Sequence, residues 1–293
     1  MIKLVLFIIR ECLVNLLGYK LGLRKILGRG KLINVTGDVD KDINDKGAKH
    51  RSNVAKILDE LDLHPKKGRF LEMGPGGLLL HGCMVVLDGW DEYIAVDAYT
   101  SEVWSDYPIG VLESYSKTLS EDKRKIVREI IKLKDKNSLV RYYGINGVFN
   151  EDLNKHVGEK GVDFIYTWGV LEHVEDIFSV LKKNYELLSD DGIIVHVIDT
   201  HPHTWSRFSN PYVFLTISDW LWNLMYGGRG FISRLMPGDY ISAAEQAGFK
   251  VTIFNREVDD CDISNLRWKF LDRFRKFPDE EILTHRIYAV MRK

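Results

Sequence analysis

The sequence predicts an α/β fold in which a mostly parallel sheet is covered by helices on both faces. From residue 50 onward, short apolar stretches typical of buried strands alternate with stretches of helical periodicity. A glycine-containing turn at 74–77 follows the first such strand, and Asp97 ends the second. The chain has 293 residues, 45% of them hydrophobic, and is therefore long enough to bury a sizeable core.

Seven apolar stretches predict the strands of this sheet. They are residues 69–73, 93–98, 139–143, 163–168, 193–199, 250–255 and 287–291. Helical periodicity marks residues 52–63, 121–134, 174–188 and 239–247. Two connections are unusually long: residues 100–137 between the second and third strands, which exceed what one helix needs, and residues 201–237 between the fifth strand and the next helix. The second contains three tryptophans and is too aromatic for a solvated loop, so it predicts an acceptor-binding lid after the fifth strand.

Charge and cysteine content exclude some classes of function. The net charge of −1 gives no whole-chain basic excess, so a nucleic-acid partner is not expected. Cys12, Cys83 and Cys261 are far apart and form no CxxC pair. A disulfide framework or a cysteine zinc site is therefore not expected, and a reducing, cytoplasmic location fits.

Residues 1–48 predict a helical segment and linker that precede a domain at 49–293. The apolar run 4–9 is too short to span a bilayer. A polar stripe recurs at helical spacing through this segment, and a basic cluster follows at its far end. The stripe comprises Glu11, Asn15, Gly18, Gly22, Lys25 and Arg29, and the cluster Lys20, Arg24, Lys25, Arg29 and Lys31. Two interpretations stay open: a helix lying in a membrane interface, or a helix packed on its own domain. The membrane interpretation also rests on six rings of the connection 201–237 that are of a type favouring membrane interfaces: Trp205, Tyr212, Phe214, Trp220, Trp222 and Tyr226.

The turn Gly74–Gly77 after the first strand predicts a nucleotide site. Gly74 and Gly76 permit a tight turn and close backbone approach to a ligand. A carboxylate at Asp97 can accept hydrogen bonds from both ribose hydroxyls. Leu79 stands where a dinucleotide-binding turn needs its third glycine. Glu72 would repel a pyrophosphate but attract the ammonium and sulfonium charges of S-adenosylmethionine, so this cofactor is predicted over NAD.

These elements together resemble class I S-adenosylmethionine-dependent methyltransferases. The resemblance rests on the glycine turn with Glu72, on Asp97, and on the sequence GVLEHV at 169–174 after the fourth strand, and it covers residues 50 to 293. It implies a Rossmann-like seven-stranded sheet, with residues near Asn146 beside the adenine. The residues predicted to bind the cofactor are Glu72, Gly74, Gly76, Gly77, Asp97, Asn146, Trp168, Gly169 and His173.

A narrower resemblance concerns the segment after the fifth strand. It is similar to methyltransferases found with bacterial surface-polysaccharide biosynthesis enzymes, in which an Asp is followed four residues later by a His, as Asp199 and His203 are here. If the acceptor is a hydroxyl, a base must take its proton, and histidine suits that role at neutral pH. His203 is the first candidate base, His201 the second, and Asp199 the residue that orients one of them. Chelation of a metal by these three residues is a weaker alternative, and no metal is predicted.

The sequence therefore predicts a methyltransferase that O-methylates a sugar hydroxyl of a glycan or lipid-linked saccharide. Under the first interpretation of residues 1–31, this segment contacts the inner face of the membrane. Methylation of another small or lipophilic acceptor is the alternative within the same class. A non-catalytic membrane-associated protein that keeps the fold is a second alternative. A nucleotide-dependent oxidoreductase is disfavoured by Glu72 and Leu79.

Overall fold

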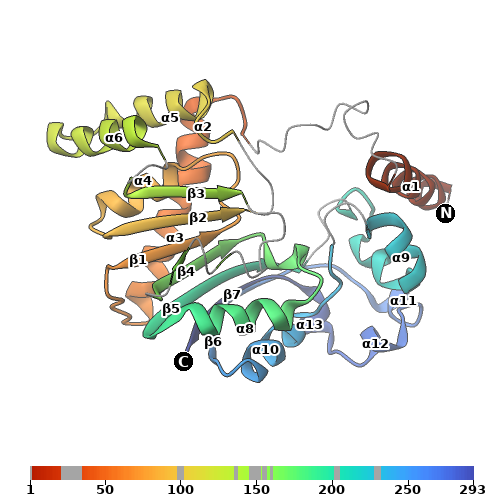
Figure 1. The fold of residues 1–293 in the computed structure, drawn as a ribbon. Coiled ribbons are helices and arrows are strands. Elements are labelled where there is room, and N and C mark those ends of the chain that lie inside the picture. The colour runs from red at the N-terminus through yellow and green to blue at the C-terminus, as the bar shows by residue number, and fades with distance from the viewer. Residues whose placement is uncertain are drawn as a thin grey trace.

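The computed structural model describes residues 2–20, 35–97, 102–134, 138–144, 153, 157–158, 161–200, 205–227 and 232–293. The strands are β1 (Arg69–Met73), β2 (Glu92–Asp97), β3 (Val140–Gly144), β4 (Val162–Trp168), β5 (Leu188–Asp199), β6 (Lys250–Val258) and β7 (Thr284–Arg292). They form one sheet in the order β3-β2-β1-β4-β5-β7-β6 (Figure 1). All pairs are parallel except those of β7, which runs antiparallel to β5 and β6. The predicted seven-stranded, mostly parallel, Rossmann-like sheet is confirmed.

Helices cover both faces of the sheet, as predicted. The helices before and between the first strands are α2 (Val39–Ile43), the π-helical turn η3 (Asn44–Ala48), α3 (Lys49–Glu60), α4 (Leu80–Leu87), α5 (Asp106–Ser116) and α6 (Glu121–Leu133). Helices α3, α4, α5 and α6 contribute to a core on one face, with Phe70 and Tyr93 of the sheet. The 3-10 turn η4 (Leu171–His173), α8 (Ile177–Leu187) and α10 (Pro237–Gln246) contribute to the core on the other, with Leu71 and Ile94. Successive strand residues thus serve opposite faces.

A third apolar core lies outside the sheet layers, on the right of Figure 1. Its elements are α1 (Ile2–Leu13), η6 (Pro211–Thr216), α9 (Asp219–Tyr226), α11 (Ser264–Arg267), α12 (Asp272–Arg275) and α13 (Asp279–Leu283). Trp205 is at its centre, fully buried, and contacts Phe7 of α1 edge-to-face with ring centroids 4.9 Å apart. The aromatic segment after β5 therefore joins the N-terminal helix to the C-terminal helices.

This core corrects one expectation. Six rings of the insertion were expected to favour a membrane interface: Trp205, Tyr212, Phe214, Trp220, Trp222 and Tyr226. All but Trp220 are buried, whereas Trp220 is 69% exposed. The rings pack on one another and on α1, because burying large aromatic surfaces within the protein is more favourable than leaving them exposed to water.

The N-terminal helix is oriented with its polar stripe toward the protein. Glu11 and Asn15 of the predicted stripe are buried, and Asn15 Nδ2 donates to the backbone oxygen of Leu224 at 2.9 Å. After α1 the chain continues as a π-helix, η1 (Val14–Lys20). The apolar side chains of the opposite face are exposed: Ile2, Val5, Leu6, Ile9, Leu13, Leu16 and Leu17. Within the described ranges, no helix has both the length and the apolarity that crossing a membrane requires.

Candidate functional site

The candidate site is a cavity of about 680 Å³ at the carboxyl ends of β1, β4 and β5, where ligands of open parallel sheets bind. The sheet contributes the turn after β1, the end of β4 and the end of β5, and the segment before β1 contributes the facing wall. The lining residues are Thr36, Lys41, Asp45, Lys46, Lys49, His50, Gly74, Pro75, Gly76, Gly77, Leu78, Trp168, Gly169, His173, Val197, Asp199 and Arg286. Six of the residues predicted to bind the cofactor are in this set: Gly74, Gly76, Gly77, Trp168, Gly169 and His173.

The glycine turn has the conformation that glycine alone adopts at low cost. Gly74 and Gly76 both have φ of +73°, and Gly169 opposite them has φ of +66°. The Gly74 N–H donates to the Val96 carbonyl of β2 at 2.7 Å, which fixes the turn against the next strand. A Cβ at Gly74 would overlap the side chain of Val170, whereas a Cβ at Gly76 would meet no atom within 4 Å. The turn is therefore packed against the protein at Gly74 and open to a ligand at Gly76.

Asp97 ends β2 one residue beyond the carbonyl that holds the glycine turn. It pairs in register with Gly144, the last residue of β3, and it is partly exposed. This position beside the turn is consistent with the predicted ribose contact, which stays a prediction. Asn146, predicted beside the adenine, lies outside the described residues.

Glu72 has a different environment from the one expected. Its carboxylate is buried and accepts a hydrogen bond from the Tyr93 hydroxyl at 2.6 Å, and Nδ1 of His81 lies 2.6 Å from the same oxygen. Glu72 and Phe70 are on the same face of β1 because side chains alternate along a strand, and that face is covered by α4. Glu72 does not line the cavity, so direct contact with a cofactor charge has no support from this geometry. These partners lower the pKa of Glu72, in opposition to burial, which raises it.

The wall opposite the glycine turn was not predicted from the sequence. The imidazole of His50 in α3 stacks on Trp168 of β4, with ring centroids 5.1 Å apart and planes 26° apart. Lys49 Nζ lies 5.5 Å from the centre of the same indole. Burial lowers the pKa of His50 to about 4, so its ring is neutral at physiological pH. The helical periodicity of 52–63 indicated the helix, but no motif indicated that it closes the cavity.

An ion pair lines the cavity at the end of β5, and a buried carboxyl lies beside it. Asp199 at the end of β5 is nearly buried, and Arg286 Nη2 of β7 lies 3.3 Å from its carboxylate. Glu172, next to the lining residue His173, is also buried, and burial raises its pKa to about 8. Glu172 is therefore protonated at neutral pH. Arg286 was not singled out from the sequence, since an ion pair between two strands far apart in the chain has no local signal, and Glu172 was noted only within the GVLEHV motif. His201 and His203 lie outside the described residues.

The residues in and beside the cavity fit S-adenosylmethionine. The open backbone at Gly76 would admit the methionine part, and Lys46 and Lys49 supply positive charge for its carboxylate. Asp97 would hold the ribose, and Trp168 provides an aromatic wall. The cofactor would supply a methyl group on a sulfonium, and its transfer needs an aligned nucleophile and exclusion of water.

Residues 47–252 match the family model described as a methyltransferase domain. No curated protein matches the chain in sequence.

Solved structures with a similar arrangement are distant. An S-adenosylmethionine-dependent methyltransferase from Mesorhizobium loti is 14% identical, with 87% of this chain and 100% of that chain covered and a TM-score of 0.43. The Burkholderia thailandensis 1,6-didemethyltoxoflavin-N1-methyltransferase is 13% identical, with 87% and 82% covered and a TM-score of 0.45. The CurJ carbon methyltransferase is 16% identical at a TM-score of 0.41, with 81% of this chain covered, but this chain spans only 51% of it. Similarity this low does not identify an acceptor.

The family match spans more than half of the chain, from the helix that walls the cavity to the sixth strand, and includes the glycine turn, Asp97 and the residues after β4. The chain belongs to the methyltransferase-domain family and is an S-adenosylmethionine-dependent methyltransferase.

Proposed function

We propose that this methyltransferase transfers the methyl group to a hydroxyl of a saccharide acceptor, bound in a second cavity that adjoins the cofactor cavity. This second cavity has a volume of about 550 Å³ and shares Asp199 and Arg286 with the first. Its other lining residues are Ser206, Ser209, Pro211, Asp259, Asp260, Cys261 and His285. The shared residues support the proposal most directly, because an acceptor bound here lies next to the cofactor.

The chemistry of the second cavity favours a polyhydroxylated ligand. Carboxylates such as those of Asp259 and Asp260 accept hydrogen bonds from neighbouring hydroxyls, and serine hydroxyls can donate or accept. Asp259 is itself held by the Tyr212 hydroxyl at 2.6 Å, so its position is fixed by the aromatic core of the insertion. The predicted acceptor lid at 201–237 therefore contributes Ser206, Ser209 and Pro211 to the cavity wall and supports it from behind.

In this proposal the acceptor hydroxyl oxygen attacks the methyl carbon of the sulfonium. The new O–C bond forms as the C–S bond breaks, the electron pair stays on sulfur, and S-adenosylhomocysteine leaves as a neutral thioether. The hydroxyl proton goes to a base, for which His203 is the first candidate and His201 the second. Asp199, which lies between the two cavities, orients the base and the acceptor.

The orientation of α1 supports a lipid-linked acceptor at a membrane surface. Leu6 and Ile9 are 61% and 50% exposed, on the face that α1 turns away from the protein. The basic residues of the N-terminal segment follow this face in sequence, from Lys20 to Lys31. An apolar helix face beside positive charge is typical of binding to an anionic membrane interface.

Transfer of labelled methyl groups from S-adenosylmethionine to free glycans and to glycolipids tests the acceptor class. We expect label in acid-stable O-methyl sugars, and a loss of about tenfold in kcat/KM when Asp260→Asn removes a carboxylate from the second cavity. Asp122→Asn is the control, since Asp122 is exposed on α6. Label on nitrogen or carbon of the acceptor, or equal rates for the two variants, would contradict the saccharide proposal.

Cosedimentation with anionic vesicles tests the membrane proposal. Deleting residues 1–31 would also remove Phe7 from the aromatic core, so point variants are more informative. We expect wild-type binding that weakens with salt, and a loss of at least about tenfold in Leu6→Gln/Ile9→Gln, because each exposed apolar side chain contributes about 1 kcal/mol or more when buried. Leu139→Gln, an exposed apolar position beside β3, should bind as wild type does. Wild-type protein that stays in the supernatant at low salt would refute the membrane proposal.

A further inference from the structure

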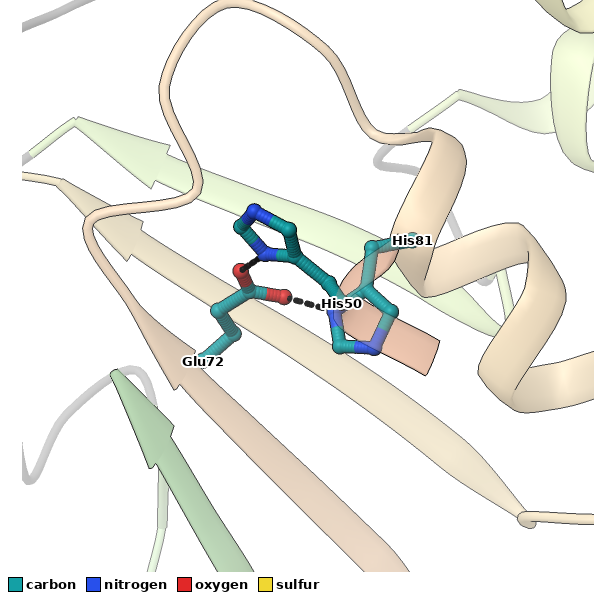
Figure 2. Close-up of side chains that lie close together, drawn as sticks. All are labelled: His50, Glu72 and His81. Carbon is teal, nitrogen blue, oxygen red and sulfur yellow. Dashed lines mark hydrogen bonds and ion pairs between the residues drawn. The ribbon is translucent and has the colours of Figure 1, made fainter. Parts of the chain in front are cut away.

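Three side chains capable of binding a metal lie close together beside the cofactor cavity, and one of them, His50, also lines it. His50 comes from α3, Glu72 from β1 and His81 from α4, and Figure 2 shows the carboxylate of Glu72 between the two imidazoles. One ligand atom from each residue lies within 4.8 Å of the others. The cluster therefore joins α3, which forms part of the cavity wall, to β1 of the sheet and to α4, which covers the sheet.

One ring nitrogen that faces Glu72 lacks a hydrogen-bond partner among the described residues. His50 Nδ1 is buried and unpaired, whereas His81 Nδ1 is in contact with Glu72 Oε2. Buried polar atoms are nearly always paired, and an unpaired one commonly marks an ordered water or an ion. His50 Nδ1 lies 3.9 Å from Oε1 of Glu72, which is too far for a hydrogen bond. Two ligands of one metal ion, each about 2.0–2.2 Å from it, are separated by a distance of this order.

We propose that His50, Glu72 and His81 bind a divalent transition-metal ion of the zinc class. Two imidazoles and one carboxylate suit Zn²⁺ or Co²⁺, whereas Mg²⁺ prefers oxygen ligands. The ion would take the place of the proton on His81 Nδ1, which faces Glu72 Oε2, and the imidazole would stay neutral by carrying its single proton on Nε2. Tyr93 continues to donate to the carboxylate, a supporting hydrogen bond of the kind that orients metal ligands.

The consequence for the enzyme is structural. The segment from residue 36 to 50 supplies Thr36, Lys41, Asp45, Lys46, Lys49 and His50 to the cofactor cavity. A metal ion held between His50 and the β1–α4 unit would fix α3 in place, and with it this wall. The metal takes no part in methyl transfer itself, and this inference holds whichever acceptor the enzyme uses.

Titration of tag-free, chelator-treated enzyme with Co²⁺ tests the proposal through visible d–d absorption, with Zn²⁺ as competitor. We expect one Co²⁺ per chain and a metal-dependent rise in the melting temperature. His50→Phe keeps the ring on Trp168 but removes the ligand, and it should weaken Co²⁺ binding by about tenfold or more and abolish the rise. His81→Gln should behave likewise. His64→Ala is the matched control, because His64 is exposed and paired only with Asp62 among its described contacts.

Wild-type protein that binds no Co²⁺ at one equivalent would overturn the proposal, as would equal binding by wild type and His50→Phe. Circular dichroism and S-adenosylhomocysteine binding establish that the variants are folded. Should both variants fail to fold, X-ray absorption of the zinc-loaded wild type decides the question: two imidazole nitrogens at about 2.0–2.1 Å support the site, and fewer contradict it.

Discussion

Replacing Gly74 by alanine should destabilise the fold more than replacing Gly76, although both glycines have φ of +73°. An L-residue in this conformation costs about 1–2 kcal/mol at either position. At Gly74 the added methyl would also overlap Cγ2 of Val170, and such overpacking costs about 1–3 kcal/mol more. We therefore expect a loss of about 2–5 kcal/mol in the free energy of unfolding for Gly74→Ala and about 1–2 kcal/mol for Gly76→Ala.

Cofactor affinity should fall more in Gly76→Ala than in Gly74→Ala. The methyl of Gly76→Ala would enter the open space of the cavity, where the cofactor must approach the backbone, so S-adenosylhomocysteine affinity should fall by about tenfold or more, or about 1.4 kcal/mol. Urea unfolding measures the stabilities and calorimetry the affinities. The double variant Gly74→Ala/Val170→Ala should recover part of the stability, since it removes the overlap. Equal unfolding energies for the two single variants would refute the packing argument.

Three further predictions follow from buried groups. Burial raises the pKa of Glu172 to about 8, so the folded chain holds this proton between about pH 4.5 and 8 while the unfolded chain has lost it, and stability falls as pH rises through this window. In Glu172→Gln the free energy of unfolding should depend less on pH. Relative to wild type, the variant should be more stable at pH 8.5 than at pH 5 by up to several kcal/mol, at about 1.4 kcal/mol per pKa unit. Parallel curves of unfolding free energy against pH for the two proteins would contradict this. Trp205→Ala should cost about 3–5 kcal/mol in urea unfolding because Trp205 is fully buried in the third core, and a cost below about 1 kcal/mol would mean that this core is loosely packed. Asp199→Asn should lower kcat by about tenfold or more with little change in S-adenosylhomocysteine affinity, and an unchanged kcat would remove Asp199 from the proposed positioning of the base.

The sheet and the glycine turn were predictable because their signals are local. The strand at 69–73 has the predicted bounds, and the others agree to within a few residues apart from β5, which begins at Leu188 rather than 193. Helical periodicity gave no bounds for α4, which follows the glycine turn, because this helix is apolar on every side and lacks the pattern of a half-exposed helix. The connection 100–137 contains α5 in addition to the helix predicted at 121–134, which is α6.

The parts of the site that could not be predicted depend on contacts between distant segments. Glu72 was assigned to the cofactor because it precedes the turn, but the pleat of β1 directs it toward His81 and Tyr93. The alternation of strand residues contains that information, since Phe70 and Glu72 must share a face. His50 had no such signal, because its place in the cavity depends on how α3 packs. The direction in which α1 presents its polar stripe was also undetermined, since an amphipathic pattern alone does not say which face meets the protein.

Calorimetric titration with S-adenosylhomocysteine tests most directly that the cavity at the ends of β1, β4 and β5 is the cofactor site. We predict one site per chain in the wild type, no binding of NAD, and a loss of about 2–3 kcal/mol in Asp97→Ala, which removes two charge-assisted hydrogen bonds to the ribose. The exposed-residue control Asp122→Ala should bind as wild type does. Binding of NAD without S-adenosylhomocysteine, or an affinity that Asp97→Ala leaves unchanged, would contradict this assignment.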